Sequence, residues 1–268
     1  NGQPAAARAA YEAVLAAYPR HFDALYLLGV LFIQAGEPTR AVELLRRALS
    51  EVPQHPDANN DLGNALFALG QFQEALAYID RVLSLQPGHA EAWYTRGRCL
   101  QALGRPQEAI QAYDQAIALV PQVHEAHTNR GVALHALNQH LEALQSYERA
   151  IALNPQSATA HYNRGITQLA LRQHGEALQS FNLALSINPR YPEALNNRSI
   201  ALIALKRPKE AIESCDAAIA LRPDFADPYY HRGDALSELG QFELAFENYG
   251  RAVSLDSSLP FLYGVWLH

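Results

Sequence analysis

The sequence predicts an all-α fold in which pairs of antiparallel helices stack one after another into an α-solenoid. Three observations predict it. Proline, glycine and alanine recur every 34 residues along the chain, and each period holds two stretches with helical apolar patterning. The composition is that of an ordinary folded chain, with 49% hydrophobic and 18% charged residues. One such period cannot bury its apolar face alone, so its stability has to come from its neighbours.

Four series of residues share this spacing. The proline series is Pro19, Pro53, Pro87, Pro121, Pro155, Pro189 and Pro223. A small-residue series is Gly29, Gly63, Gly97, Gly131, Gly165, Ser199 and Gly233. Two further series are mostly alanine, one running from Ala41 to Ala245 and the other from Ala48 to Ala252. Their common register predicts a half repeat over residues 1–21 and seven repeats that begin at residues 22, 56, 90, 124, 158, 192 and 226.

The third repeat shows the helix signals. Residues 92–103 form the first predicted helix and residues 106–119 the second, with Gly104 between them, where a helix end favours a left-handed residue. Gly97 and Ala109 are expected on facing helices, because small side chains allow close approach. Arg172 and Lys206 replace the turn glycine in two other repeats, which predicts strained or differently shaped turns there.

Composition and charge exclude several classes of protein. The net charge is −6 and lysine occurs only at Lys206 and Lys209, so no basic face for nucleic acid is expected. No apolar stretch reaches the length of a membrane span, and no secretory signal is visible. The chain starts at Asn1 without methionine and is interpreted as a processed or excised piece. Two lone cysteines, Cys99 and Cys215, fit a reducing, cytoplasmic compartment.

No catalytic or metal-binding pattern is present in the sequence. It has no glycine-rich phosphate loop, nucleophile elbow or HExxH motif. His21, His55 and His89 lie a full period apart, and the pair His124 and His127 has no third ligand nearby. We therefore expect no enzyme activity, no metal and no cofactor.

A 34-residue unit with Gly at position eight, Ala at positions twenty and twenty-seven and Pro at position thirty-two resembles the tetratricopeptide repeat. The resemblance covers residues 1–259 and implies a right-handed superhelix whose first helices line a concave groove for a protein or peptide. The apolar segment 260–268 is expected to be a cap or a linker to a missing domain.

The resemblance and the helical period together predict which residues line the groove. Position six carries Asp61, Thr95, Asn129, Asn163, Asn197 and His231, position five carries Tyr94, Tyr162 and Tyr230, and position nine carries Asn64 and Arg98. An asparagine side chain offers a donor and an acceptor, so the three asparagines could bond the backbone of an extended peptide. They could equally bond between adjacent helices and stabilise the stack.

Three functions follow from these residues. The first is a protein-interaction scaffold that binds a partner segment in the groove. The second is the substrate-recruiting arm of a bacterial protein glycosyltransferase without its catalytic domain, because the asparagine ladder and the tail 259–268 are similar to those of O-linked N-acetylglucosamine transferase. The third is self-assembly, with weak homo-oligomers forming through the solenoid ends. A chaperone-tail clamp is not expected, since the clamp positions carry no lysine.

Overall fold

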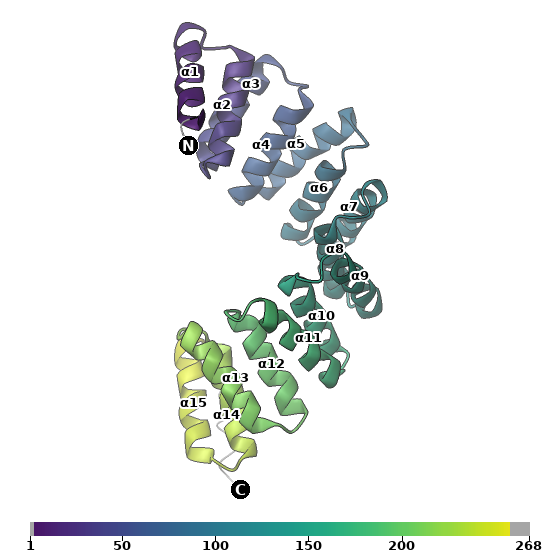
Figure 1. The fold of residues 1–268 in the computed structure, drawn as a ribbon, viewed down its shortest axis with the longest axis vertical. Coiled ribbons are helices and arrows are strands. Elements are labelled where there is room, and N and C mark those ends of the chain that lie inside the picture. The colour runs from purple at the N-terminus through teal and green to yellow at the C-terminus, as the bar shows by residue number, and fades with distance from the viewer. Residues whose placement is uncertain (1–2, 258–268) are drawn as a thin grey trace. The chain divides into compact units, whose positions relative to one another are not determined.

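The computed structural model describes residues 3–257, which form fifteen α-helices and no strand (Figure 1). The helices are α1 Gln3–Ala17, α2 Phe22–Gln34, α3 Pro38–Glu51, α4 Pro56–Ala68, α5 Phe72–Leu85, α6 Ala90–Ala102, α7 Pro106–Leu119, α8 His124–Ala136, α9 His140–Leu153, α10 Ala158–Ala170, α11 His174–Ile187, α12 Pro192–Ala204, α13 Pro208–Leu221, α14 Ala226–Glu238 and α15 Phe242–Leu255. The predicted all-α fold is confirmed.

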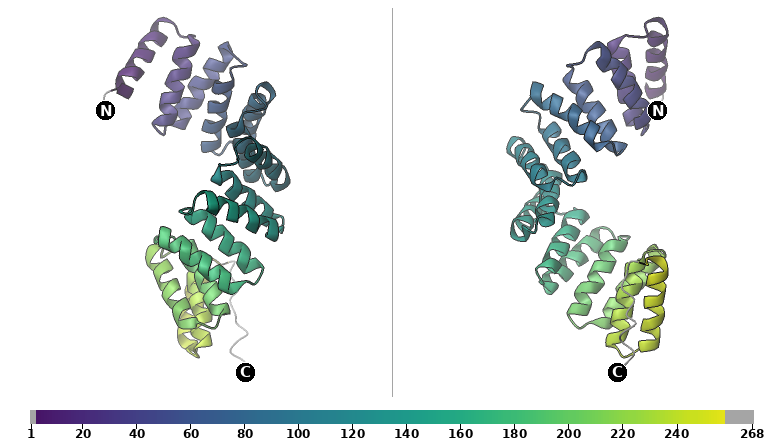
Figure 2. Two further views of the ribbon diagram at one scale, coloured as in Figure 1. Left: turned by 45° about the vertical axis from the view of Figure 1, so that its right-hand side comes forward. Right: turned by 180° about the vertical axis from the view of Figure 1, so that it is seen from behind.

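The chain divides into two compact units, Asn1–Leu137 with α1–α8 and Asn138–His268 with α9–α15. Within unit 1, the pairs α2/α3, α4/α5 and α6/α7 run antiparallel, and each second helix also packs against the next first helix (Figure 2). The backbones of successive first helices approach one another closely, whereas those of successive second helices lie farther apart and are joined by an ion pair between the long side chains of Arg46 of α3 and Glu74 of α5. Unit 2 shows the same arrangement in α10–α15. In each unit the first helices therefore lie side by side on one face.

Three of the loop histidines begin first helices. The Nδ1 atoms of His21, His55 and His89 accept hydrogen bonds from the backbone N–H groups of Ala24, Ala58 and Ala92, over 3.3, 3.2 and 3.1 Å. Such a bond satisfies an N–H that a helix start otherwise leaves without a partner. Ser157 does the same for α10. The recurrence of histidine at this loop position thus has a local structural cause.

The turn inside each repeat has one shape whichever residue it carries. Gly36, Gly70, Gly104 and Gly240 have φ between 70° and 75°, and Asn138, Arg172 and Lys206 have φ of 58–59°. The amide of Arg172 donates to the carbonyl of Leu169 just as that of Gly104 donates to Gln101. The turns at Arg172 and Lys206 are therefore left-handed like the glycine turns, and strain rather than a different shape accompanies the substitution.

Arg172→Gly is expected to raise the free energy of unfolding by about 0.5–1 kcal/mol. Relief of the left-handed conformation is worth roughly 1–2 kcal/mol, and the greater freedom of glycine in the unfolded chain offsets about half of it. Urea unfolding followed by circular dichroism measures the change. Gly104→Arg, the reverse substitution in unit 1, serves as the control and should lower stability. A loss of stability in Arg172→Gly would contradict this assignment.

Glycine at position eight makes room for a large side chain of the second helix. A Cβ atom added to Gly97 would lie 2.4 Å from Cε1 of Tyr113, and one added to Gly165 would lie 2.6 Å from Cε1 of Phe181. Both rings are fully buried. Gly97 and Ala109 are both buried, on the facing helices α6 and α7, and the three atoms nearest to a Cβ built on Gly97 all belong to Tyr113.

The segment 260–268, predicted as a cap or linker, lies outside the described residues. The assignment of residues 1–259 to one solenoid domain also stays a prediction. Within residues 3–257, no helix has the length and apolar character needed to cross a bilayer.

Candidate functional site

The predicted groove residues lie on the first helices of the two units. We call Asp61, Asn64, Tyr94, Thr95, Arg98 and Asn129 the unit 1 strip, and Tyr162, Asn163, Asn197, Tyr230 and His231 the unit 2 strip. The unit 1 residues come from α4, α6 and α8, and the unit 2 residues from α10, α12 and α14. These helices are neighbours within their unit, so each strip crosses several repeats.

Tyrosine hydroxyls link neighbouring first helices in alternate repeats. The Nδ2 atom of Asn129 donates to the hydroxyl of Tyr94 over 3.0 Å, and the Tyr26 hydroxyl donates to Oδ2 of Asp61 over 3.1 Å. Burial raises the pKa values of Tyr94 and Asp61. The Oδ1 atom of Asn129 forms no hydrogen bond with the part of the chain that the structure describes. Asn129 therefore contributes to the stack and still presents an acceptor.

Asn64 is oriented by its neighbours on α6. Its Oδ1 atom accepts a hydrogen bond from the Thr95 hydroxyl over 3.0 Å, and its Nδ2 atom donates to Oε1 of Glu91 over 3.3 Å. Thr95 is only 1% exposed, whereas Asn64 is half-buried. Thr95 thus positions Asn64 and has almost no surface of its own for a ligand.

A hollow of about 300 Å³ opens beside Arg98, which we call the Arg98 hollow. It is lined by Phe67, Arg98, Gln101, Ala102, Tyr113 and Asn129. The Arg98 guanidinium carbon lies 3.9 Å from the centre of the Phe67 ring and 5.7 Å from that of Tyr94. No carboxylate among residues 3–257 forms an ion pair with it. Stacking fixes the plane of the guanidinium while its N–H groups can still donate.

The two asparagines of the unit 2 strip differ in their hydrogen bonding. The Nδ2 atom of Asn197 donates to the Tyr162 hydroxyl over 3.1 Å, and its Oδ1 atom accepts from Asn196 over 3.4 Å. The side chain of Asn163 bonds no residue in the described range and is half-buried. Burial raises the pKa of Tyr162. Asn197 is therefore committed to the stack, whereas the amide of Asn163 keeps its donor and acceptor.

At the end of the unit 2 strip, Tyr230 meets His231 edge-on, with ring centres 5.7 Å apart. The Nδ1 atom of His231 lies 3.5 Å from Oδ2 of Asp234. Both side chains are half-buried, and burial raises the pKa of Tyr230. At this end of the strip, Tyr230 and His231 therefore present aromatic rings to a ligand, whereas Asn163 presents an amide.

A second repeated contact holds the loops and was not anticipated. Polar side chains at position four bond to the carbonyl of the loop proline six residues earlier. The donors are Asn59, Trp93 and Tyr229, with distances of 3.0, 2.8 and 3.2 Å, and ring nitrogens of His127 and His161 make the same contact over 3.1 and 3.0 Å. In the sequence, the signal that could have predicted this contact is the constant spacing of six residues between the proline series and the polar residues at position four.

The recurring arginines at position seven have structural partners. Arg96 and Arg130 donate to Asp80 and Asp114 on second helices over 2.8 and 2.6 Å. Arg164 and Arg198 donate to the hydroxyls of Ser180 and Ser214, each over 2.9 Å. These arginines join helices, so Arg98 at position nine is distinct from them.

The two cysteines of the described part are buried and lie far from each other in the sequence. Cys99 and Cys215 are buried thiols, and burial raises the pKa of each to about 11, which makes them unreactive at neutral pH. Within residues 3–257, no three His, Cys, Asp or Glu side chains gather as metal ligands.

The geometry defines a helical-repeat protein whose first helices carry polar strips. Tetratricopeptide repeat family models match residues 1–56, 60–124, 100–158 and 128–192 in one form, 32–83 and 168–237 in a second, and 226–259 in a third. The chain belongs to the tetratricopeptide repeat family. A search of curated protein sequences finds no match.

Solved structures show the same fold. A tetratricopeptide repeat protein from Parabacteroides merdae ATCC 43184 is similar with a TM-score of 0.69 and 21% identity, over 88% of this chain and 93% of that one. The APC/C hetero-tetramer Cut9–Hcn1 gives 0.71 and 17%, over 94% of this chain and 50% of that one. YrrB, described as a TPR protein with an unusual peptide-binding site, gives 0.57 and 24%, over 70% and 96%.

These structural similarities show the fold alone. That the chain is the recruiting arm of a glycosyltransferase stays a prediction. The same holds for the expected lack of catalytic activity, the cytoplasmic and bacterial origin, and self-assembly.

Proposed function

We propose that this chain is a protein-interaction scaffold that binds an extended segment of a partner along its first-helix strips. The observation that carries the proposal is the Arg98 hollow, where a stacked guanidinium without an ion pair and the Oδ1 atom of Asn129 share one recess. An extended segment carries both carbonyl oxygens and N–H groups. Arg98 can donate to a carbonyl or carboxylate of the segment, and Asn129 can accept from an N–H.

Shape and chemistry of the recess support the same ligand class. Phe67 gives the hollow an apolar wall beside the guanidinium. Gln101 adds polar capacity, although its Oε1 atom already accepts from Tyr113 over 3.0 Å. A side chain of the segment would therefore meet both an apolar wall and donors. The description of YrrB as a protein with a peptide-binding site supports the proposal within the same fold.

The experiment selects ligands from a library of displayed random peptides and measures their affinity by calorimetry. Arg98→Ala and Asn129→Ala are each expected to weaken binding about two- to tenfold, since one hydrogen bond contributes roughly 0.5–1.5 kcal/mol net. Leu183→Ala on the outer side of α11, where Leu183 is 45% exposed, is the control and should bind normally. No selected peptide, or affinities unchanged in both variants, would overturn the proposal.

Two variants in unit 2 distinguish an effect on ligand binding from an effect on the packing of neighbouring helices. Asn163→Ala is expected to weaken the binding of peptides selected against the unit 2 strip and to leave the melting temperature unchanged, because the Asn163 side chain bonds no described residue. Asn197→Ala removes the bond to Tyr162 and should lower the melting temperature as well. Equal thermal losses in the two variants would assign both asparagines to the stack.

A further inference from the structure

Three carboxylates gather where α4 meets α6 in unit 1. Asp57 and Asp61 lie one turn apart on α4, and Glu91 lies in the first turn of α6, where the Nδ2 atom of Asn64 donates to it over 3.3 Å. Burial raises the pKa of Asp61, and the negative charges of Asp57 and Glu91 raise it further. No Arg or Lys of the described residues forms an ion pair with any of the three. We call Asp57, Asp61 and Glu91 the α4/α6 acidic cluster.

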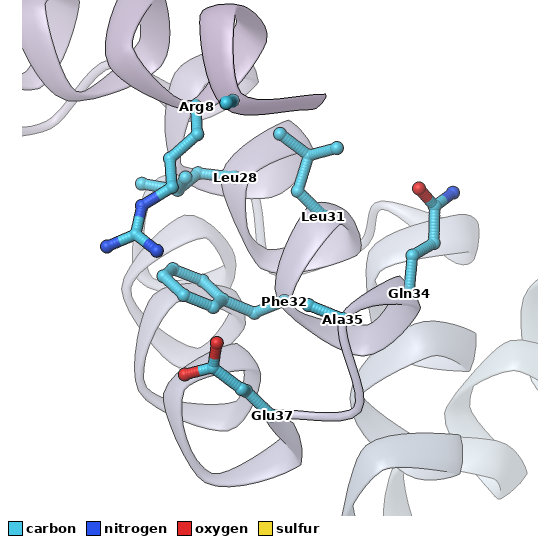
Figure 3. A pocket seen from close by; sticks show the side chains of 8 residues that line it. Arg8, Leu28, Leu31, Phe32, Gln34, Ala35 and Glu37 are labelled. Atoms are coloured by element: carbon cyan, nitrogen blue, oxygen red, sulfur yellow. The ribbon is translucent and has the colours of Figure 1, made fainter. Parts of the chain in front are cut away.

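Other carboxylates of unit 1 have cationic partners. Figure 3 shows Glu37 at the edge of a mostly apolar cavity of about 400 Å³, and this carboxylate is paired with Arg40 over 2.7 Å (Figure 3). Asp80 on α5 is paired with Arg96 over 2.8 Å. The first turn of a helix favours a carboxylate even without a cation, but Asp61 lies in the second turn of α4 and is half-buried. The helix start therefore does not account for the cluster.

The matching place in unit 2 holds a cation that the chain itself supplies. Glu193 occupies in α12 the position of Asp57 in α4, and the Nη1 atom of Arg222 donates to its Oε1 atom over 2.7 Å. The guanidinium of Arg222 is also stacked 3.9 Å from the centre of the Phe225 ring. In the repeat that contains Asp57, the position of Arg222 is taken by Gln86, which has no charge. A guanidinium therefore fits this carboxylate position, and unit 1 does not provide one.

A buried acceptor beside the cluster also has no donor. Asn60 is only 7% exposed, and its Oδ1 atom has no hydrogen-bond partner among the described residues. Side chains at position five turn toward the next first helix, as the bond from Tyr26 to Asp61 shows. Asn60 therefore lies on the side of α4 that faces Glu91. Buried polar groups are almost always bonded, and carboxylate oxygens can only accept, so both features call for a ligand that donates.

Tyr26 supplies a wall for the stem of a long basic side chain. Its hydroxyl donates to Oδ2 of Asp61 over 3.1 Å, which holds that carboxylate next to the ring. The ring also contacts His55, with ring centres 5.4 Å apart. The Nδ1 atom of His55 accepts from the backbone N–H of Ala58 over 3.2 Å, so it does not carry the proton that would make the imidazole a cation. A cation over a tyrosine ring is attracted by its π electrons.

We propose that the α4/α6 acidic cluster binds a lysine or arginine side chain of the partner segment. This inference rests on the proposed function, because the same segment occupies the Arg98 hollow. Glu91 and Arg98 lie seven residues apart on α6, which is about 10 Å along a helix, and an extended segment spans that distance with about three residues. An ammonium or guanidinium group only donates, which matches a set of groups that only accept. The partner of unit 1 is thus a basic segment.

The experiment uses peptides selected with the full chain from a displayed random library. Peptides whose affinity depends on Arg98 are expected to share a lysine or arginine at one position. Replacing that residue by glutamine should weaken binding about fivefold or more, because it removes a charge-assisted contact. In the Asp57→Asn/Asp61→Asn/Glu91→Gln chain the two peptides should bind equally. Asparagine at position 61 keeps an acceptor for the Tyr26 hydroxyl, and circular dichroism checks that the variant is folded.

Glu43→Gln is the control for lost charge, since Glu43 is exposed on α3 and forms no ion pair with a described residue. It should keep the full difference between the two peptides. If the triple variant does not fold, Asp61→Lys should bind a peptide with glutamate in place of the basic residue better than the original peptide.

The two proposals fail in different ways. No selected peptide, or affinities unchanged in both Arg98→Ala and Asn129→Ala, would overturn the proposed function and this inference with it. Peptides that depend on Arg98 but share no basic residue would overturn this inference alone. A difference between the basic and glutamine peptides that persists in the triple variant, or a preference of Asp61→Lys for the basic peptide, would do the same.

Discussion

Phe181→Ala is expected to lower the free energy of unfolding by about 3–5 kcal/mol, the range for removing a buried phenylalanine ring. Phe181 is fully buried in unit 2, and its ring is in direct contact with Gly165 of α10. The same core contains Leu178 and Leu202, so it joins consecutive repeats. The cavity that alanine leaves would therefore weaken the contact between repeats as well as the helix pair.

Leu183→Ala is the matched control, since Leu183 lies on the same helix and is 45% exposed. Its loss should stay near or below about 0.5–1 kcal/mol. Urea unfolding monitored by circular dichroism, with calorimetric melting as a second probe, measures both variants. Similar losses for Phe181→Ala and Leu183→Ala would contradict the assignment of Phe181 to the core.

Gly97→Leu is expected to cost about 3 kcal/mol, at the upper end of the usual range for overpacking. The first added atom would lie within 2.4–2.8 Å of three atoms of the Tyr113 ring. The ring has little room to move, because it is fully buried and its hydroxyl donates to Oε1 of Gln101 over 3.0 Å. α6 and α7 would have to separate, which disturbs the Arg98 hollow that both helices line.

Gly175→Leu tests the same chemical change at an open site. Apart from its chain neighbours and the backbone of its own helix, no atom lies within 4 Å of a Cβ built on Gly175, which is near the start of α11. Because leucine is a better helix former than glycine by up to about 1 kcal/mol, this variant should be neutral or more stable. In a Tyr113→Ala background, Gly97→Leu should lose most of its effect. An unchanged effect there would place the strain somewhere other than the Tyr113 ring.

The strips change how the asparagine series is understood. The sequence allowed the three asparagines to bind a ligand or to join helices. Asn129 and Asn197 each donate to a tyrosine of the preceding first helix, whereas the Asn163 side chain bonds no described residue. Tyrosine occupies position five in alternate repeats, so the asparagine after it is the one engaged. Asparagine at position six is thus bonded to the preceding first helix in two repeats and to no described side chain in a third.

The sequence by itself determined the fold class, the pairing of helices and the start of the second helix at Pro106, whereas the first helix predicted over 92–103 spans Ala90–Ala102. These features follow from periodic apolar side chains, prolines and turn residues that act within one 34-residue repeat. The turns at Gly104 and Arg172 have the same shape, so they too are determined within one repeat. The end of the helix and its hydrogen bonds outweigh the conformational preference of the single turn residue.

Only the tertiary structure decided which polar groups remain available to a ligand. The partner of Asn129 is a hydroxyl 35 residues away, the Tyr113 ring is the side chain packed on Gly97, and Arg98 stacks on Phe67 of the preceding repeat. Each contact depends on the separation and rotation of neighbouring helices. These quantities are set by packing across repeats, and no periodic pattern within one repeat contains them.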